Sequence, residues 1–298
     1  MQTMTAPKNP KRNHHHVWQA YLKPWTTNKE IWCLSEGEVA LKRTKFIAVD
    51  RDFYKLHQLT PTDLTLLKLF ISQGNKYSQE TNQQLLYLIT SPYEVVKHIP
   101  NLRPAAKIIL EKYSFEVLED YHSQIENSFA PLLEKARQGD LSFYTDEKCI
   151  SFINYICTQY MRTKGVKERT VKKLAEIGAG DFSRIWNIMI HMFATNIGTG
   201  LYSERHKRIL QLLENKSSVP FITGDQPIIN LKSKNGQSPD QLSFYYPISP
   251  KLAIFLSDID EPPMNPKIDE YEATELNKKI KDASYLQVFG DSKESLRI

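Results

Sequence analysis

The amino-acid sequence predicts a single α+β domain over residues 1–298, with a helical bundle inserted between two sheet-forming parts. Residues 13–59 and 217–298 contain short alternating apolar stretches bounded by Gly, Pro and Asp, which is the pattern of strands and turns. Residues 60–216 instead repeat apolar side chains at three- and four-residue steps, the period of a helix. This order indicates a mixed or antiparallel sheet built from the N- and C-terminal strands.

The first part of the chain leads into an apolar segment that carries three histidines. Residues 1–12 are polar and aperiodic, so we expect a flexible lead-in. The stretch NHHHVWQAYLKPW, residues 13–25, becomes apolar at once, so its histidines belong to the domain and not to a purification tag. Three strands of a small antiparallel meander are expected next, at 30–37, 38–44 and 45–56.

The helical part begins at Thr60, which can cap a helix that has Pro61 in its first turn and Asp63 near its positive end. A second helix, NQQLLYLI, is expected to stop at Ser91-Pro92. Three stronger helical patterns follow, and the last of them is apolar nearly all round, which indicates a central helix. They cover residues 115–140, 146–163 and 182–197.

Strands return after Lys216. The stretch 219–231 is broken at Gly224 and Pro227, and a hairpin is expected around Ser249-Pro250. An amphipathic helix at 269–283 and a last strand at 284–290 complete the domain.

Composition excludes several classes of protein. No apolar run approaches the roughly 20 residues that span a bilayer, and the N-terminus has no apolar signal segment, so we expect no membrane association. Three cysteines without a CxxC pair favour a reduced, cytoplasmic protein. The sequence has no phosphate-binding glycine loop and no GxSxG, and it identifies neither a cofactor nor an oligomeric state. The net charge of +5 permits an anionic partner such as nucleic acid.

Several short motifs occur in the order typical of one family. HHHVWQAYLKPW resembles its N-terminal His-His-Tyr-Val-Pro-Gln-x-Tyr-Leu motif, although Trp18 replaces the proline and Trp25 stands where Phe is usual. Further matches are RDFYKL, QIENSFA, TQYMRT, ITGDQPI, YPISP and ELNKKI. The chain thus resembles the family catalogued as domain of unknown function 4238. That resemblance implies a bacterial protein, often encoded in mobile or variable genomic regions, and implies no reaction.

The histidines alternate along an extended segment, so His14 and His16 are expected on one face and His15 on the other, pointing inward. Two same-face imidazoles can begin a metal site. Nothing near them in the sequence completes one, so we predict no metal site. His15 is the candidate functional imidazole, and His14, Tyr21 and Tyr54 fall on motif positions that support it.

Glu119, His122 and Glu126 fall on one helix face at i, i+3 and i+7. We expect Glu119 and His122 to be solvated. Glu126 lies between apolar residues and needs a cationic or hydrogen-bonding partner. Arg162, one turn after Gln159, can supply it, either as a structural bridge or as a fork for a phosphate in a pocket.

Two further features bear on function. A basic run follows Arg162 and is either a phosphate-binding surface or an ordinary solvated face. Its members are Lys164, Lys167, Arg169, Lys172 and Lys173. Asp225, in a turn at a strand end, is a general base, a metal ligand or an Asx-turn residue that only shapes the bend. His191, alone on an apolar helix, is expected to be a hydrogen-bonded core histidine.

These residues lead to one enzymatic hypothesis and two alternatives. Convergence of His15, Glu126, Gln159, Arg162 and Asp225 would give an acid–base cluster suited to a phosphodiester. We therefore predict a nuclease-like enzyme, metal-free or with one metal, acting as a toxin or defence effector. The alternatives are a non-catalytic module that binds nucleic acid or protein, and a buried polar network with a purely structural role.

Overall fold

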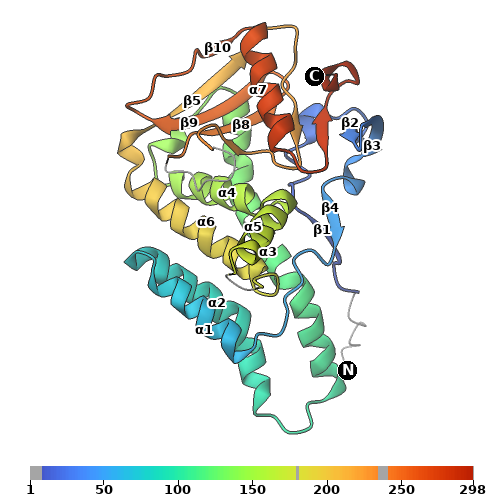
Figure 1. Ribbon diagram of the computed structural model, residues 1–298, viewed down its shortest axis with the longest axis vertical. Helices are drawn as coiled ribbons and strands as arrows, with labels where there is room; N and C mark the ends of the chain where they lie inside the picture. The colour runs from blue at the N-terminus through green and yellow to red at the C-terminus, as the bar shows by residue number, and fades with distance from the viewer. Residues whose placement is uncertain (1–8, 179–180, 234–240, 298) are drawn as a thin grey trace, which may run out of the picture.

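The computed structural model describes residues 9–178, 181–233 and 241–297. Most strands lie at one end of the molecule and helices α1 to α3 reach the other, with α4, α5 and α6 between them, and β1 and β4 lie beside the middle (Figure 1). The helices are α1 (Pro61–Ser72), α2 (Lys76–Lys97), α3 (Pro104–Arg137), α4 (Cys149–Met161), α5 (Lys164–Glu176), α6 (Trp186–Ser203) and α7 (Glu270–Ala283).

The strands confirm the α+β class but form three sheets, where the sequence predicted one. They are β1 (Asn13–His15), β2 (Glu30–Ser35), β3 (Glu38–Arg43), β4 (Val49–Arg51), β5 (Arg208–Asn215), β6 (Thr223–Gly224), β7 (Ile229–Asn230), β8 (Phe244–Ser249), β9 (Leu252–Asp258), β10 (Lys267–Ile268) and β11 (Val288–Gly290). The five-stranded sheet has the order β10-β5-β9-β8-β7, the four-stranded sheet has the order β3-β2-β11-β6, and β1 pairs with β4.

Among the sheets of the described residues, only the four-stranded one joins the two chain ends as expected, because β11 lies between β2 and β6. The break expected at Gly224 and Pro227 is present, and it sends β6 and β7 into different sheets. The expected hairpin around Ser249 is β8–β9. The predicted helical part ended at residue 216, which is wrong, because β5 begins at Arg208 and pairs with β9 throughout its length.

The predicted third strand of the meander is also wrong. A short 3-10 turn, Thr44–Phe46, and a positive φ of 46° at Ala48 turn the chain away from β3. The next strand, β4, therefore pairs with β1. This pairing is what places the histidine segment.

Helix boundaries follow local chemistry, with one exception. Thr60 and Asp63 form the reciprocal capping box that opens α1. The second helix was expected to stop before Pro92, yet α2 continues to Lys97. Pro92 has no N–H for the carbonyl of Leu88, and the hydroxyl of Tyr113 donates to that carbonyl instead. The helix continues because a neighbouring helix supplies the missing hydrogen bond.

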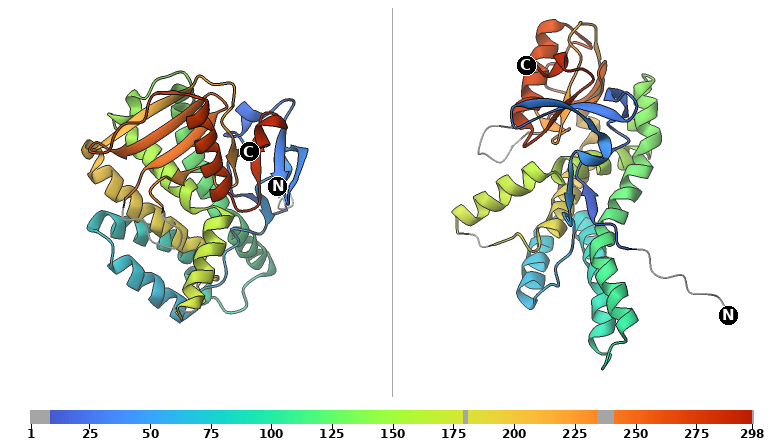
Figure 2. Two further views of the ribbon diagram at one scale, coloured as in Figure 1. Left: turned by 45° about the horizontal axis from the view of Figure 1, so that its top comes forward. Right: turned by 90° about the vertical axis from the view of Figure 1, so that its right-hand side faces the viewer.

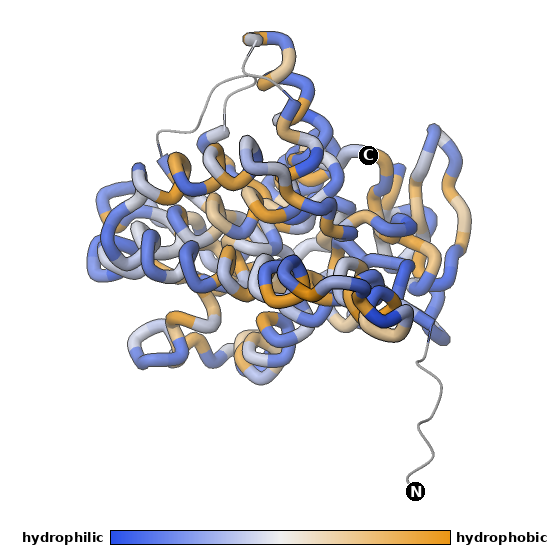
Figure 3. The backbone as a smooth tube through the Cα atoms, turned by 90° about the horizontal axis from the view of Figure 1, so that it is seen from below, coloured by the Kyte–Doolittle hydropathy of each residue, from blue (hydrophilic) through white to orange (hydrophobic). Residues whose placement is uncertain are grey.

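The N-terminal residues and the helices share one core. Residues 1–8, part of the expected lead-in, lie outside the described residues, and Lys11 is not loose, since its backbone N–H donates to Glu116 at 3.0 Å. Figure 2 shows the first strand, β1, beside α3. Apolar and hydrophilic residues alternate along the helices (Figure 3). Helix α6 is buried along most of its first half, as expected of a central helix.

Two further observations concern bulk properties. Cys33, Cys149 and Cys157 are buried and free. Within the described parts of the chain, no helix is both long and apolar enough to cross a membrane.

Candidate active site

The histidine segment alternates as predicted, but it faces the opposite way. His14 and His16 are buried, and His15 is partly exposed. The pairing of β1 with β4, in the register of His15 with Val49, fixes this orientation. Alternation is visible in a sequence, but the face that meets the core is set by the partner strand and by α3.

His14 has a structural environment. Its Nδ1 accepts from the backbone N–H of Tyr54 at 2.8 Å, and its Nε2 donates to the carbonyl of Lys11 at 2.9 Å. The ring also stacks on Tyr54. Both ring nitrogens of His14 are therefore used inside the protein. His16 is buried beside Asp50, with Nε2 and Oδ2 3.5 Å apart.

His15 faces a pocket of about 570 Å³. The pocket brings together one imidazole, two carboxyl groups of α3 and two exposed lysines. It is lined by His15, Trp18, Gln19, Ala20, Lys23, Thr26, Lys29, Thr44, Glu119 and Glu126. Of the predicted site residues, His15 and Glu126 line this pocket. They lie there with Glu119, which was expected to be solvated, and with Lys23 and Lys29, which the sequence analysis did not single out.

The environment of His15 favours a neutral ring. Burial lowers its pKa below the ordinary value, and the nearby charge of Glu119 opposes that shift. The amide nitrogen of Gln19 lies at hydrogen-bond distance from His15 Nε2. Because an amide nitrogen can only donate, Nε2 is the acceptor and the proton of the neutral ring lies on Nδ1.

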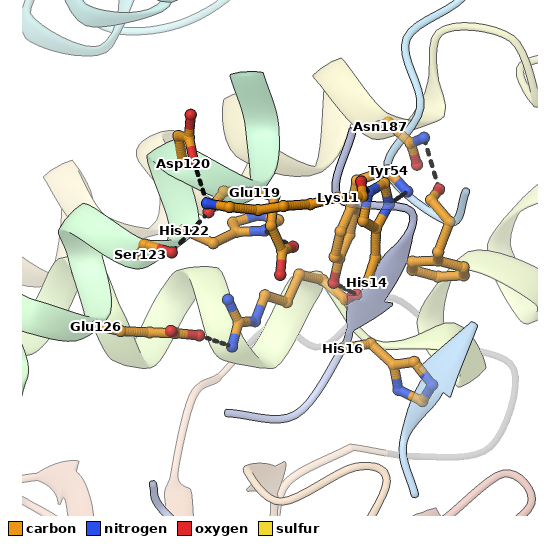
Figure 4. A network of polar contacts seen from close by, with 12 residues as sticks. Lys11, His14, His16, Tyr54, Glu119, Asp120, His122, Ser123, Glu126 and Asn187 are labelled. Carbon is orange, nitrogen blue, oxygen red and sulfur yellow. Dashed lines mark hydrogen bonds and ion pairs between the residues drawn. The ribbon is translucent and has the colours of Figure 1, made fainter. Parts of the chain in front are cut away.

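Glu119 and Glu126 reach the pocket from the same face of α3, as their i, i+7 spacing allows. Figure 4 shows both, together with His122, projecting from the helix toward β1, which carries His14 and is followed by His16. Burial raises the pKa of each carboxyl, and the charge of Arg162 opposes the rise. Glu119 was expected to be solvated, which is wrong.

The predicted bridge between Glu126 and Arg162 is present at 2.5 Å (Figure 4). Arg162 is buried, and it also donates twice to Gln159 Oε1, at 3.0 and 2.7 Å. Gln159 in turn donates to the carbonyl of His16 at 2.9 Å, and Tyr54 donates to the carbonyl of Arg162 at 2.8 Å. Neither Arg162 nor Gln159 lines the pocket. They lie behind Glu126 and hold it in place.

His122 was expected on a solvated face, and instead it is buried against His191. The two Nε2 atoms are 3.2 Å apart, and burial lowers the pKa of both rings well below the ordinary value. His191 is thus the hydrogen-bonded core histidine that the sequence predicted. On the other side of His122, its Nδ1 and Glu119 Oε2 are 3.9 Å apart, and both are buried without a hydrogen bond to any residue that the structure describes.

Asp225 does not line this pocket. Its carboxylate accepts from the backbone N–H groups of Tyr285, Leu286 and Gln287, at 2.7, 2.7 and 3.1 Å. Asp225 therefore fixes the chain where it enters β11. Tyr21 is also a core residue, because its hydroxyl donates to the carbonyl of Pro247 at 2.7 Å.

The basic residues of α5 do not form one free stripe. Lys164 pairs with Asp50 at 3.0 Å, Lys167 lies over the ring of Phe53, and Lys172 pairs with Glu176 at 3.9 Å. Arg169 lines a different pocket. The exposed lysines at the candidate site are instead Lys23 and Lys29, from the N-terminal segment.

The shared helix face of Glu119 and Glu126 was visible in the sequence from their i, i+7 spacing, but the burial of Glu119 at the pocket was not. No sequence pattern relates Lys23 and Lys29 to the glutamates, because the folding of the N-terminal segment onto α3 brings these lysines to the pocket. Among the described residues, no group of three or more His, Cys, Asp or Glu side chains could hold a metal ion.

One comparison with known proteins gives a result. A family model described as "Protein of unknown function (DUF4238)" matches residues 13–294, nearly the whole chain. The chain therefore belongs to this family, which the N-terminal histidine motif and the later motifs indicated. No curated protein and no solved structure matches the chain.

Proposed function

We propose that the pocket around His15 is the active site of a nuclease-like enzyme that cleaves phosphodiester bonds of nucleic acid. The observation that supports this most is the meeting of one imidazole and two carboxyl groups in a single pocket of about 570 Å³. General acid–base catalysis needs such a pair, one group without its proton and one with it. The environments of His15 and Glu119 shift their pKa values in the directions that provide it.

The neutral ring of His15 is suited to act as the base. A substrate hydroxyl or water takes the place of the Gln19 amide at Nε2 and gives its proton to that nitrogen as its oxygen forms the new bond to phosphorus. The bond from phosphorus to the leaving oxygen breaks, and that oxygen receives the proton of the Glu119 carboxyl. The raised pKa of Glu119 keeps more of this carboxyl protonated near neutral pH than in a solvated glutamate.

The other residues of the pocket bind the substrate and position the attacking hydroxyl. Lys23 and Lys29 are exposed at the pocket and provide positive charge for phosphate groups. Glu126, fixed by Arg162 and Gln159, is an acceptor for the attacking hydroxyl. We further propose that the protein is bacterial and acts in the cytoplasm as a toxin or defence effector. The free, buried cysteines are consistent with a reducing compartment.

Cleavage of labelled RNA and DNA oligonucleotides by purified protein tests this proposal. We expect His15→Ala, Glu119→Gln and Glu126→Gln to lower the rate by roughly 10²–10⁴. His15→Ala should leave the melting temperature unchanged. Two exposed positions outside the pocket serve as controls, His98→Ala and, on the same helix as the glutamates, Glu134→Gln.

Other outcomes point elsewhere. A fall of melting temperature together with activity in all three variants would assign the cluster a structural role. Salt-dependent nucleic-acid binding that is lost on charge reversal of Lys167, Arg169 and Lys172, without any cleavage, would indicate the binding module. Unchanged activity and melting in both His15→Ala and Glu126→Gln would refute the proposed site. Growth of cells that express the wild type or His15→Ala tests the toxin role separately.

A further inference from the structure

A second pocket, of about 510 Å³, lies among helices α2, α3, α4 and α6. It shares no lining residue with the pocket around His15. Small-molecule sites in proteins commonly have volumes of about 300–1,000 Å³, so this pocket is large enough for such a ligand. Figure 1 shows α6 between α4 and α2. These three helices form the principal walls of the pocket.

The walls are mostly apolar, and the described lining residues are uncharged. Three of the lining side chains are aromatic, namely Tyr77, Tyr121 and Tyr202, and Ile150 and Ile153 add aliphatic surface. None of the described residues that line the pocket carries a formal charge. Burying a charged group here would leave its desolvation uncompensated. A planar and uncharged ligand, which can stack on tyrosine rings, suits these walls.

Two hydroxyl groups of the pocket are already used as donors. Thr81 Oγ1 donates to the carbonyl of Tyr77 at 3.1 Å, and Ser203 Oγ donates to the carbonyl of Thr199 at 2.8 Å. A hydroxyl has one proton and two lone pairs, so both oxygens keep only the capacity to accept. These two oxygens therefore favour a ligand that carries N–H or O–H donors.

Asn154 supplies the complementary group at the mouth. Its side chain is exposed, and within the described part of the chain its amide makes no hydrogen bond. Such an amide can donate and accept at once, which is how asparagine pairs with the edge of an adenine. At the same mouth, the side chains of Tyr77 and Ile150 are 70% and 53% exposed. A bound ring would cover this apolar surface.

We propose that this second pocket binds an uncharged nitrogen heterocycle that carries N–H donors, of the nucleobase or nucleoside class. The tyrosines stack on the ring, the wall hydroxyls accept its N–H groups, and Asn154 pairs with its edge. The shared chemistry has two possible sources, a free nucleoside or a base of a single strand. The site is independent of the proposed nuclease activity, because the two pockets have no residue in common.

Isothermal titration calorimetry of the whole protein tests the site, with adenosine, guanosine, cytidine and uridine as probes and a short oligoadenylate as the second arm. We expect at least one probe to bind. Asn154→Trp fills the mouth and should weaken binding at least tenfold, whereas Asn127→Trp, at an exposed asparagine of α3, should leave it unchanged. Ile150→Glu, which places a charge in the wall, should weaken binding as Asn154→Trp does.

The set of probes that bind to the wild type and to the variants shows whether the ligand is a free nucleoside or a base of a strand, and it tests the proposed site. Binding of a nucleoside assigns the pocket to a free small molecule, and binding of oligoadenylate alone assigns it to a base of a strand. Failure of all the probes, or binding that survives in both Asn154→Trp and Ile150→Glu, would overturn the site. Nucleic-acid cleavage by the wild type, or its absence, would change neither conclusion.

Discussion

Acidification should destabilise this protein through its buried histidine pair. His122 and His191 are each 2% exposed, and their pKa values are far below the ordinary value of 6.5. Burial is the main cause for both, followed by the charge of Arg162 for His122 and by His122 for His191. In the unfolded chain both rings titrate near 6.5. The stability that depends on their neutrality is thus fully present above pH 6.5 and is lost as the pH falls toward the folded pKa values.

The size of the effect follows from the unfolded chain. At pH 5.0 its protonation is worth about 2 kcal/mol per histidine, or about 4 kcal/mol for the pair, while the folded rings stay neutral. Glu119 and Glu126 act in the opposite direction, because a raised carboxyl pKa makes the folded state bind protons as the pH falls toward 4.5. The histidine contribution must therefore be measured as a difference between variants.

Urea unfolding at pH 7.5 and 5.0 gives that difference. The wild type should lose about 4 kcal/mol more between the two pH values than His122→Leu/His191→Leu, and about 2 kcal/mol more than His191→Leu alone. Only the change with pH matters, so a lower stability of the variants at pH 7.5 does not affect the comparison. An equal loss in the wild type and in both variants would refute the assignment of two neutral rings in the folded core.

Three other substitutions test the packing around the site by urea unfolding or thermal melting. Arg162→Met should cost about 3–5 kcal/mol, because it leaves the partly buried carboxylate of Glu126 without its cation; a loss below 1 kcal/mol would contradict the role of this bridge. Asp225→Ala should cost about 3 kcal/mol or more, since it strands three backbone N–H groups, and Asp225→Asn should cost less. Equal losses in these two variants would contradict that explanation. Thr60→Ala should lower stability by about 1 kcal/mol through loss of the α1 cap, and an unchanged melting temperature would count against the capping box.

Local signals in the sequence predicted the individual helices and strands better than the way in which they pack and pair. The cap at Thr60 and the break at Gly224 depend on adjacent residues, and both are present. The continuation of α2 through Pro92 depends on Tyr113, which is 21 residues further along the chain. Sequence rules that consider only neighbouring residues therefore cannot predict this continuation. Strand pairing has the same limit, because β11 was predictable as a strand but its place between β2 and β6 was not.

The candidate site shows this limit most clearly. The Glu126–Arg162 bridge was predictable, because a carboxylate among apolar residues requires a cation. The outward direction of His15 was not, since alternation alone does not tell which face meets the core. Asp225 was a reasonable base by residue type, yet three backbone N–H groups from a distant segment use its oxygens.

The pairing of β2 with β11 delays completion of the four-stranded sheet until late in the synthesis of the chain on the ribosome. The hairpin of β2 and β3 is complete at Arg43, but the strand that completes its sheet begins at Val288. At synthesis rates of about 5–20 residues per second, the hairpin waits roughly 12–50 s for its partner. The indole N–H of Trp25 likewise has no hydrogen bond to the carbonyl of Phe221 until that residue has been synthesised. The described residues that line the pocket around His15 are all synthesised once Glu126 has been added, so the sheet beside them is completed long after the pocket residues themselves.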